Sequence, residues 1–95
     1  MKVFICTFET KDGNADTETK IVQYLKNFTS SMRVHKNTWM IAADSNARKI
    51  RDGIKLLLDS YEMCFVAQLN SYEWAGWGTR VREWISRARE IPTST

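Results

Sequence analysis

Two tryptophans, Trp74 and Trp77, lie in a glycine-containing stretch that two arginines, Arg80 and Arg82, follow. Indole rings can stack on nucleobases, and the guanidinium fork binds phosphate through paired hydrogen bonds. These four residues therefore form a candidate contact set for a phosphate-bearing ligand. The alternative interpretation is structural, because the two rings could instead seat the helix that follows on a sheet.

A second basic group lies in the middle of the chain. Arg48 and Arg51 belong to a predicted helix that also carries two lysines, against a single acid, Asp52. This helix face is either a solvated surface or a further phosphate contact, and the sequence leaves both interpretations open.

Glu9 ends an apolar segment and is the candidate catalytic residue. Carboxylates hold Mg²⁺ or Mn²⁺, so Glu9 could form a metal site with Asp12 and Asp16 of the following loop, or with Glu9 of a second copy. The alternative is a solvated acid at the end of a strand. The sequence has no paired histidines and no Asp-x-Asp motif, which are typical of stronger metal sites.

For the remaining reactive side chains, one histidine and two cysteines, we expect structural roles. His35 is the single histidine, and we expect it on an exposed hairpin rather than as a general acid or base. Cys6 and Cys64 are far apart and form no Cys-x-x-Cys pair, so we expect small buried side chains rather than a zinc site or a disulfide. Glycine-rich nucleotide loops of the standard patterns are absent from the sequence.

Length and composition bound the class of protein. The 95 residues predict one domain over residues 1–91 and a flexible tail over 92–95. The net charge of +3 is small for a protein dedicated to long nucleic acids. No apolar stretch approaches the roughly 20 residues of a membrane span, and Glu9 interrupts any N-terminal signal region, so we expect a cytoplasmic protein without membrane contact.

The elements that must position these side chains follow from hydrophobic periodicity. Residues 2–9 alternate as a strand that is apolar on both faces, and a helix that Asp16 or Thr17 caps should follow. Residues 32–36 and 39–43 predict a hairpin, and the run Asp44-Ser45-Asn46 predicts a helix start. Gly53 inside this second helix indicates close packing. Residues 63–69 predict a strand, and a last helix should start near Thr79.

This order, β-α-β-β-α-β with an added helix, predicts the ferredoxin-like α+β arrangement. Its four-stranded antiparallel sheet would place the first strand between the third and the fourth. Two helices cover only one face of such a sheet, although the first and the last strand are apolar on both faces. The C-terminal helix or a second copy of the chain must cover the other face. We expect a homodimer, formed either sheet to sheet or through an edge strand.

Several segments carry a resemblance to a known group. They are residues 3–9, residues 38–41, Ile50-Arg51-Asp52, Leu58-Asp59 and residues 74–78. Over nearly the whole chain, to about Arg87, the sequence resembles short bacterial and phage proteins labelled SinR-family. Those proteins are similar in fold to the small ferredoxin-like subunit of CRISPR adaptation complexes and to virulence-associated protein D ribonucleases.

The resemblance implies a homodimer in which an acid at the end of the first strand meets its copy and holds a divalent metal. The matching residues here are Phe8-Glu9, where the group has Tyr-Asp. The carboxylate is kept, but it is carried on a side chain one methylene longer. The metal would be Mg²⁺ or Mn²⁺.

Three functions remain open from the sequence. The first is a non-catalytic homodimer that binds a nucleotide or nucleic acid, for example a phage factor that sequesters a host defence signal. The second is a metal-dependent endoribonuclease that uses Glu9. The third is a scaffold whose apolar sheet face or edge binds another protein. We favour the first, because the charge is mild and metal motifs are absent from the sequence.

Overall fold

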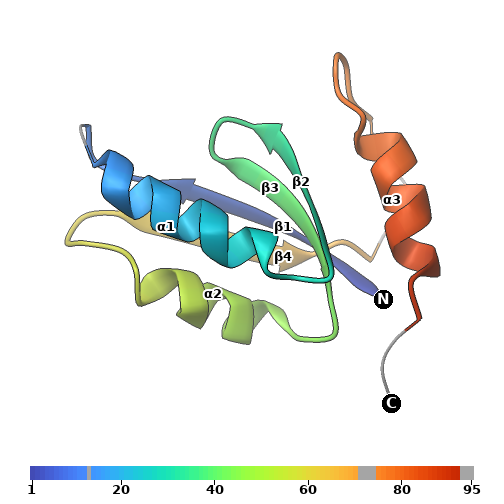
Figure 1. The fold of residues 1–95 in the computed structure, drawn as a ribbon, viewed down its shortest axis with the longest axis horizontal. Coiled ribbons are helices and arrows are strands. Elements are labelled where there is room, and N and C mark those ends of the chain that lie inside the picture. Colours follow the sequence, from blue (N-terminus) through green and yellow to red (C-terminus); the bar gives the residue numbers. More distant parts are fainter. Residues whose placement is uncertain (13, 71–74, 93–95) are drawn as a thin grey trace.

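Four strands form one antiparallel sheet with the spatial order β2-β3-β1-β4 (Figure 1). The computed structural model describes residues 1–12, 14–70 and 75–92. In chain order its elements are β1 (Lys2–Glu9), α1 (Ala15–Lys26), β2 (Ser30–His35), β3 (Thr38–Ala43), α2 (Ala47–Lys55), β4 (Met63–Gln68) and α3 (Val81–Glu90). The predicted α+β fold is confirmed, including the central position of the first strand and the added C-terminal helix.

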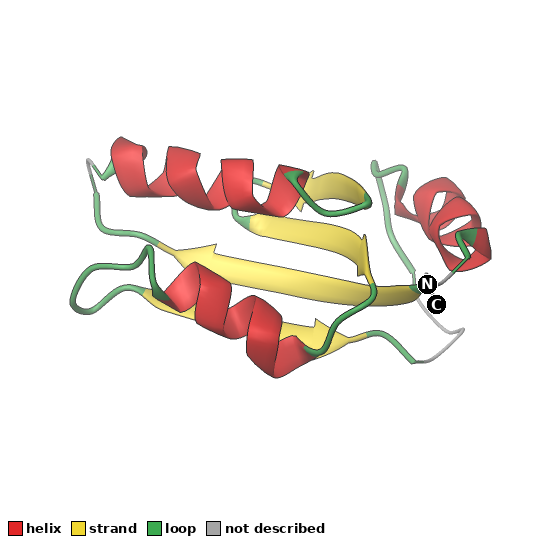
Figure 2. Cartoon of the chain, turned by 60° about the horizontal axis from the view of Figure 1, so that its bottom comes forward, coloured by secondary structure: helices red, strands yellow, loops and turns green. Residues whose placement is uncertain are grey.

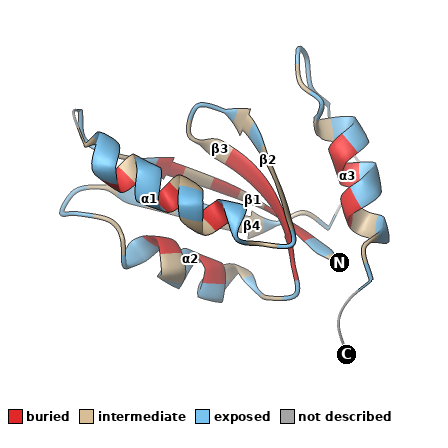
Figure 3. Ribbon diagram, viewed as in Figure 1, coloured by how far each residue is buried: buried red, intermediate tan, exposed pale blue. Residues whose placement is uncertain are grey.

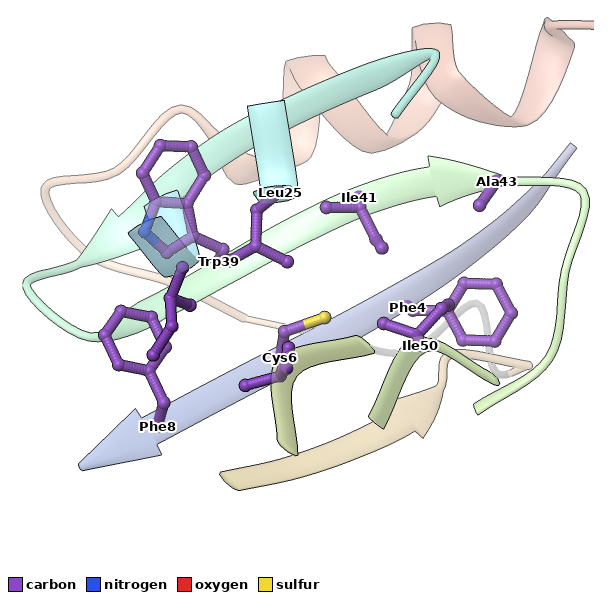
Figure 4. Packing of buried hydrophobic residues seen from close by; sticks show 10 residues of the cluster. Phe4, Cys6, Phe8, Leu25, Trp39, Ile41, Ala43 and Ile50 are labelled. Carbon is purple, nitrogen blue, oxygen red and sulfur yellow. The ribbon is translucent and has the colours of Figure 1, made fainter. Parts of the chain in front are cut away.

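One face of the sheet carries the larger core. Phe4 lies opposite Ile41 and Cys6 lies opposite Trp39, so these side chains share a face of adjacent strands. Figure 4 shows them together with Leu25, which α1 contributes. The apolar stripes of α1 and α2 cover this face, and both helices lie on the same side of the sheet in Figure 2. This core explains why Phe4, Cys6 and Phe8, which alternate along β1, are apolar.

The opposite face of the sheet is covered by α3 at one end. Val3 and Ala42 of the sheet pack there against Ile85 and Ala88 of the helix. The indole Nε1 of Trp84 donates a 2.9 Å hydrogen bond to Ser30 Oγ, which fixes α3 beside β2. The buried stripe along α3 is visible in Figure 3. The C-terminal helix, one of the two covers that the sequence left open, therefore covers part of the second face.

The same face remains exposed at the β4 side. The side chains of Met63 and Phe65 are 58% and 64% exposed. Thr7 lies opposite Phe65 and is only partly buried. One chain therefore leaves an apolar strip of its own sheet in contact with solvent.

The residues that precede α1 and α2 form hydrogen bonds over very different distances along the chain. Asn46 accepts a 2.9 Å hydrogen bond from the N–H of Lys49, which confirms the predicted cap of α2. The predicted cap of α1 at Asp16 or Thr17 is wrong, because α1 begins at Ala15 and Asn14 occupies the cap position without a side-chain capping bond. The amide group of Asn14 donates instead to Asp59 and Glu62 of a distant loop.

Other boundaries move by one or two residues. The hairpin turns at Lys36 and Asn37, one residue earlier than predicted, and β2 already begins at Ser30. The predicted turn residue Gly13 and the predicted tail from residue 93 onward lie outside the described residues. Within the described ranges, no helix combines the length and the apolar character that crossing a bilayer would require.

Candidate functional site

A cavity of about 410 Å³ lies between the second face of the sheet and the start of α3. Its floor is formed by Ile5, Val34 and Met40, which belong to three different strands. Its wall is formed by Val81 and Ile85 of α3, together with the loop that precedes this helix. The cavity is therefore mostly apolar, and it lies where the cover that α3 provides ends.

Trp77 stands at the rim of this cavity. Its side chain lines the cavity, although the residue as a whole is 96% exposed. Gly78 follows with a φ of 71°, a backbone conformation that glycine adopts without strain. An indole held at the mouth of an apolar cavity has a free face on which a planar ring can stack.

Arg80 and Arg82 flank the wall of the cavity. They alternate with Thr79 and Val81, which line it, and both arginines are exposed. Among the described residues, neither guanidinium group has a hydrogen-bond or ion-pair partner. Neither arginine lines the cavity itself, but each adjoins a lining residue in the chain and carries a charge that no described side chain neutralises.

The first turn of α3 adds to this positive region. Arg80 occupies the N-cap position, and its side chain makes no capping hydrogen bond. The N–H groups of the first turn therefore lack a side-chain acceptor at the cap, and the helix dipole places partial positive charge there. Glu83 in the same turn carries the opposing charge. The arrangement favours an anion next to an apolar ring, a combination that nucleotides have.

The other predicted binding arginines are elsewhere. Arg48 and Arg51 lie on α2, which covers the opposite face of the sheet from α3. Arg51 forms an ion pair of 2.7 Å with Asp52. The structure thus places Trp77 in the cavity lining, leaves Arg80 and Arg82 beside that lining at the start of α3, and separates Arg48 and Arg51 from all three. Trp74, the remaining predicted contact, lies outside the described residues.

The acidic candidates lie at the far end of β1. Glu9 and Asp12 both line a polar hollow of about 310 Å³, together with Lys11 and Lys36. The three-acid cluster of Glu9, Asp12 and Asp16 does not form within one chain, since the described residues contain no group of three or more metal-binding side chains. A pairing of Glu9 with its copy in a second chain stays a prediction.

The histidine and the cysteines lie where the sequence predicted. His35 is exposed at the end of β2, although it also lines the apolar cavity. Cys6 is fully buried and Cys64 is half-buried on the adjacent strand, and both are free thiols. Burial, and to a lesser degree the nearby Cys64, raises the pKa of the Cys6 thiol to about 12. Burial also raises the pKa of the Cys64 thiol, so neither cysteine is an activated nucleophile.

Sequence reasoning missed a polar cluster that joins two loops. The carboxylate of Glu62 accepts hydrogen bonds from the backbone N–H groups of Asp59 and Lys11, at 2.6 and 2.9 Å, and from Asn14 Nδ2 at 2.8 Å. These donors lower the pKa of Glu62, the Asp59 N–H most strongly. No local pattern signals the cluster, because Lys11 and Asn14 are separated from Asp59 and Glu62 by about half the chain.

Comparison with protein-family models gives no match, and searches of curated proteins and of solved structures give none either. The resemblance to SinR-family proteins therefore stays a prediction from the sequence. The fold and the cavity define a class, namely a small α+β domain with an antiparallel sheet and a mostly apolar pocket under its last helix.

Proposed function

We propose that the protein is a homodimeric, non-catalytic binding protein for a phosphate-bearing ligand, acting in the cytoplasm. One observation carries the proposal: a mostly apolar cavity lined by the exposed Trp77, with Arg80 and Arg82 next to its lining residues Thr79 and Val81 and without a side-chain partner among the described residues. The apolar part would take a planar base, and the arginines would bind its phosphate.

The dimensions favour a small nucleotide over a long nucleic acid. The volume of about 410 Å³ falls within the roughly 300 to 1,000 Å³ of small-molecule sites. A long polyanion would need many basic contacts, whereas the net charge of the chain is only +3. A nucleotide or a short oligonucleotide is therefore the ligand that these features support.

The test is thermal unfolding and calorimetric titration with mononucleotides, cyclic dinucleotides and short single-stranded RNA. A ligand that binds the folded state raises the midpoint of unfolding. We expect Arg80→Ala and Arg82→Ala each to weaken binding about 10- to 100-fold, since a hydrogen bond to a charged group contributes about 1.5 to 3 kcal/mol. Trp77→Ala should weaken it about 5- to 100-fold through lost stacking.

Arg48→Ala is the matched control, because this arginine is exposed on the opposite face of the sheet. It removes the same charge and should leave affinity within about twofold, as expected for a change in surface charge far from the ligand. Equal losses in Arg48→Ala and Arg80→Ala would show that only net charge matters. Cleavage of RNA with Mg²⁺ by the parent chain, and not by Glu9→Ala, would replace the proposal with the nuclease function.

A further inference from the structure

The two edges of the sheet differ in how they are protected from pairing with another strand. The β2 edge carries Arg33 and His35, and its register with β3 shifts between these two residues. It also lies beside α3, to which Ser30 is hydrogen-bonded. Charges, a register irregularity and a covering helix are the features by which natural sheets block edge pairing.

Within the described ranges, the β4 edge has none of these features. Its six residues, Met63–Gln68, include no charge and no proline, and its register with β1 runs without a shift. Among the described strands, none pairs with the outer side of β4. Met63 and Phe65, both on the incompletely covered face, are its exposed large side chains. This edge is an open template for another strand.

The outward backbone groups of β4 can be assigned from the hydrogen bonds of β1. The N–H of Leu69 donates to the carbonyl of Val3 at 2.8 Å. In an antiparallel ladder, alternate residues point toward the same neighbour. The N–H and C=O groups of Met63, Phe65 and Ala67 therefore point toward β1. Those of the alternate residues, Cys64, Val66 and Gln68, point outward.

We propose that β4 pairs antiparallel with β4 of a second copy and joins two sheets into one. The register places Phe65 opposite its own counterpart and Cys64 opposite Val66. The Cys64 and Val66 pairs exchange the outward hydrogen bonds, and the Phe65 pair is the closer, non-hydrogen-bonded type. The proposal rests on the dimer in the proposed function and names its interface.

The partner is a second copy because the edge is complementary to itself. An antiparallel two-fold axis makes each donor of the edge meet an acceptor of the same strand in the other copy. A charge near that axis would meet its own copy and repel it, and β4 carries none. The pairing would also bury part of the exposed Phe65 ring against an identical ring.

The first test combines light scattering with amide hydrogen exchange on the unaltered protein over a concentration series. We expect a mass of twice 11.1 kDa at high concentration and the monomer mass on dilution. The amides of Cys64 and Val66 should exchange slowly in the dimer and rapidly in the monomer. The Leu69 amide, bonded within the chain, should stay protected in both.

Two results would overturn the proposal. A monomer at every concentration removes the dimer altogether. A dimer in which the Cys64 and Val66 amides still exchange rapidly would show that the copies meet through another surface, such as the sheet face. The nucleotide titration reports on the cavity alone, so failure of the interface and failure of the proposed ligand site are separate results.

A matched pair of variants provides the second test. Phe65→Lys places a charge on the edge and should abolish the dimer while the chain stays folded. Leu56→Lys is the control, because Leu56 is an apolar side chain 87% exposed outside β4, and it should leave the dimer intact. A dimer that survives Phe65→Lys contradicts the proposal. If this variant does not fold, the exchange measurement on the unaltered chain still decides.

Discussion

Gly53 lies where α2 packs closely against α1. A Cβ atom at this position would overlap Oη and Cζ of Tyr24 and would lie 2.9 Å from its Cε1. The Tyr24 ring also packs edge-on against Phe28, with 5.3 Å between the ring centroids. The close packing predicted from a glycine inside a helix is confirmed, and its partner is the tyrosine of α1.

Gly53→Ala should lower the free energy of unfolding by up to about 2 kcal/mol. Overpacking costs about 1 to 3 kcal/mol, and the higher helix propensity of alanine offsets about 1 kcal/mol of it. Urea unfolding measures the change. In a Tyr24→Ala background the clash is absent, so the same substitution should become neutral or stabilising. An equal effect in both backgrounds would contradict this explanation.

Glu62 gives the chain a specific sensitivity to acid. Its pKa lies below the ordinary value of 4.5 in the folded state, mainly because the Asp59 N–H, and then the Lys11 N–H, bond to its carboxylate. A carboxyl group with a lowered pKa stabilises the folded state above its unfolded pKa. That stabilisation is lost as the pH falls from about 4.5 through the folded pKa.

Glu62→Gln should therefore reduce stability at neutral pH and reduce it much less at the acidic end of a pH series. The measurement is chemical unfolding of both chains at each pH. The two stability curves should converge as the pH falls through the folded pKa of Glu62. Parallel curves over the whole range would show that this carboxylate does not link the two loops as its hydrogen bonds indicate.

At the scale of elements, the start of one helix depends on a nearby hydrogen bond, whereas the residue that precedes another helix bonds to a distant loop. The start of α2 was predictable, since Asn46 caps a backbone N–H three residues away. The start of α1 was not, because Asn14 uses its amide for Asp59 and Glu62, which follow it by more than 40 residues. The Nδ2 bonds do not use the Oδ1 acceptor that a cap requires, but they tie the Asn14 amide group to partners that only the tertiary fold supplies.

The attachment of α3 depends on a single side-chain hydrogen bond together with its apolar face. Ser30→Ala removes the acceptor of Trp84 Nε1 and should lower the free energy of unfolding by about 1 to 3 kcal/mol, because the indole N–H would stay buried without a partner. Trp84→Phe removes the donor and ring volume as well, and should cost more. The double variant should cost less than the sum of the two.

Additive losses would contradict the coupling between α3 and β2. Ser86→Ala is a control within the same helix, since the Ser86 hydroxyl donates to the carbonyl of Arg82 on an exposed face. We expect that change to stay within about 0.5 kcal/mol of the parent chain, as is usual for surface substitutions.

At the scale of the whole molecule, the second face of the sheet is divided into two parts. At the N-terminal end of β1 it is covered by α3, where Val3 and Ala42 are buried. Toward β4 it is open, and Met63 and Phe65 remain exposed. The cavity that Trp77 overhangs lies where the covered part meets the open part. The proposed ligand and the proposed second copy thus use neighbouring regions of one face.

The sequence by itself determined the order of the elements, the sheet topology and the apolar face of each helix, because periodicity and short-range capping are local properties of the chain. It also marked Trp77, Arg80 and Arg82 as one group, since they are close in sequence. Only the tertiary structure decided that Arg48 and Arg51 lie on the other face, and that Ile5, Val34 and Met40 form one cavity floor. Such placements depend on strand pairing between distant segments, which local side-chain patterns do not encode.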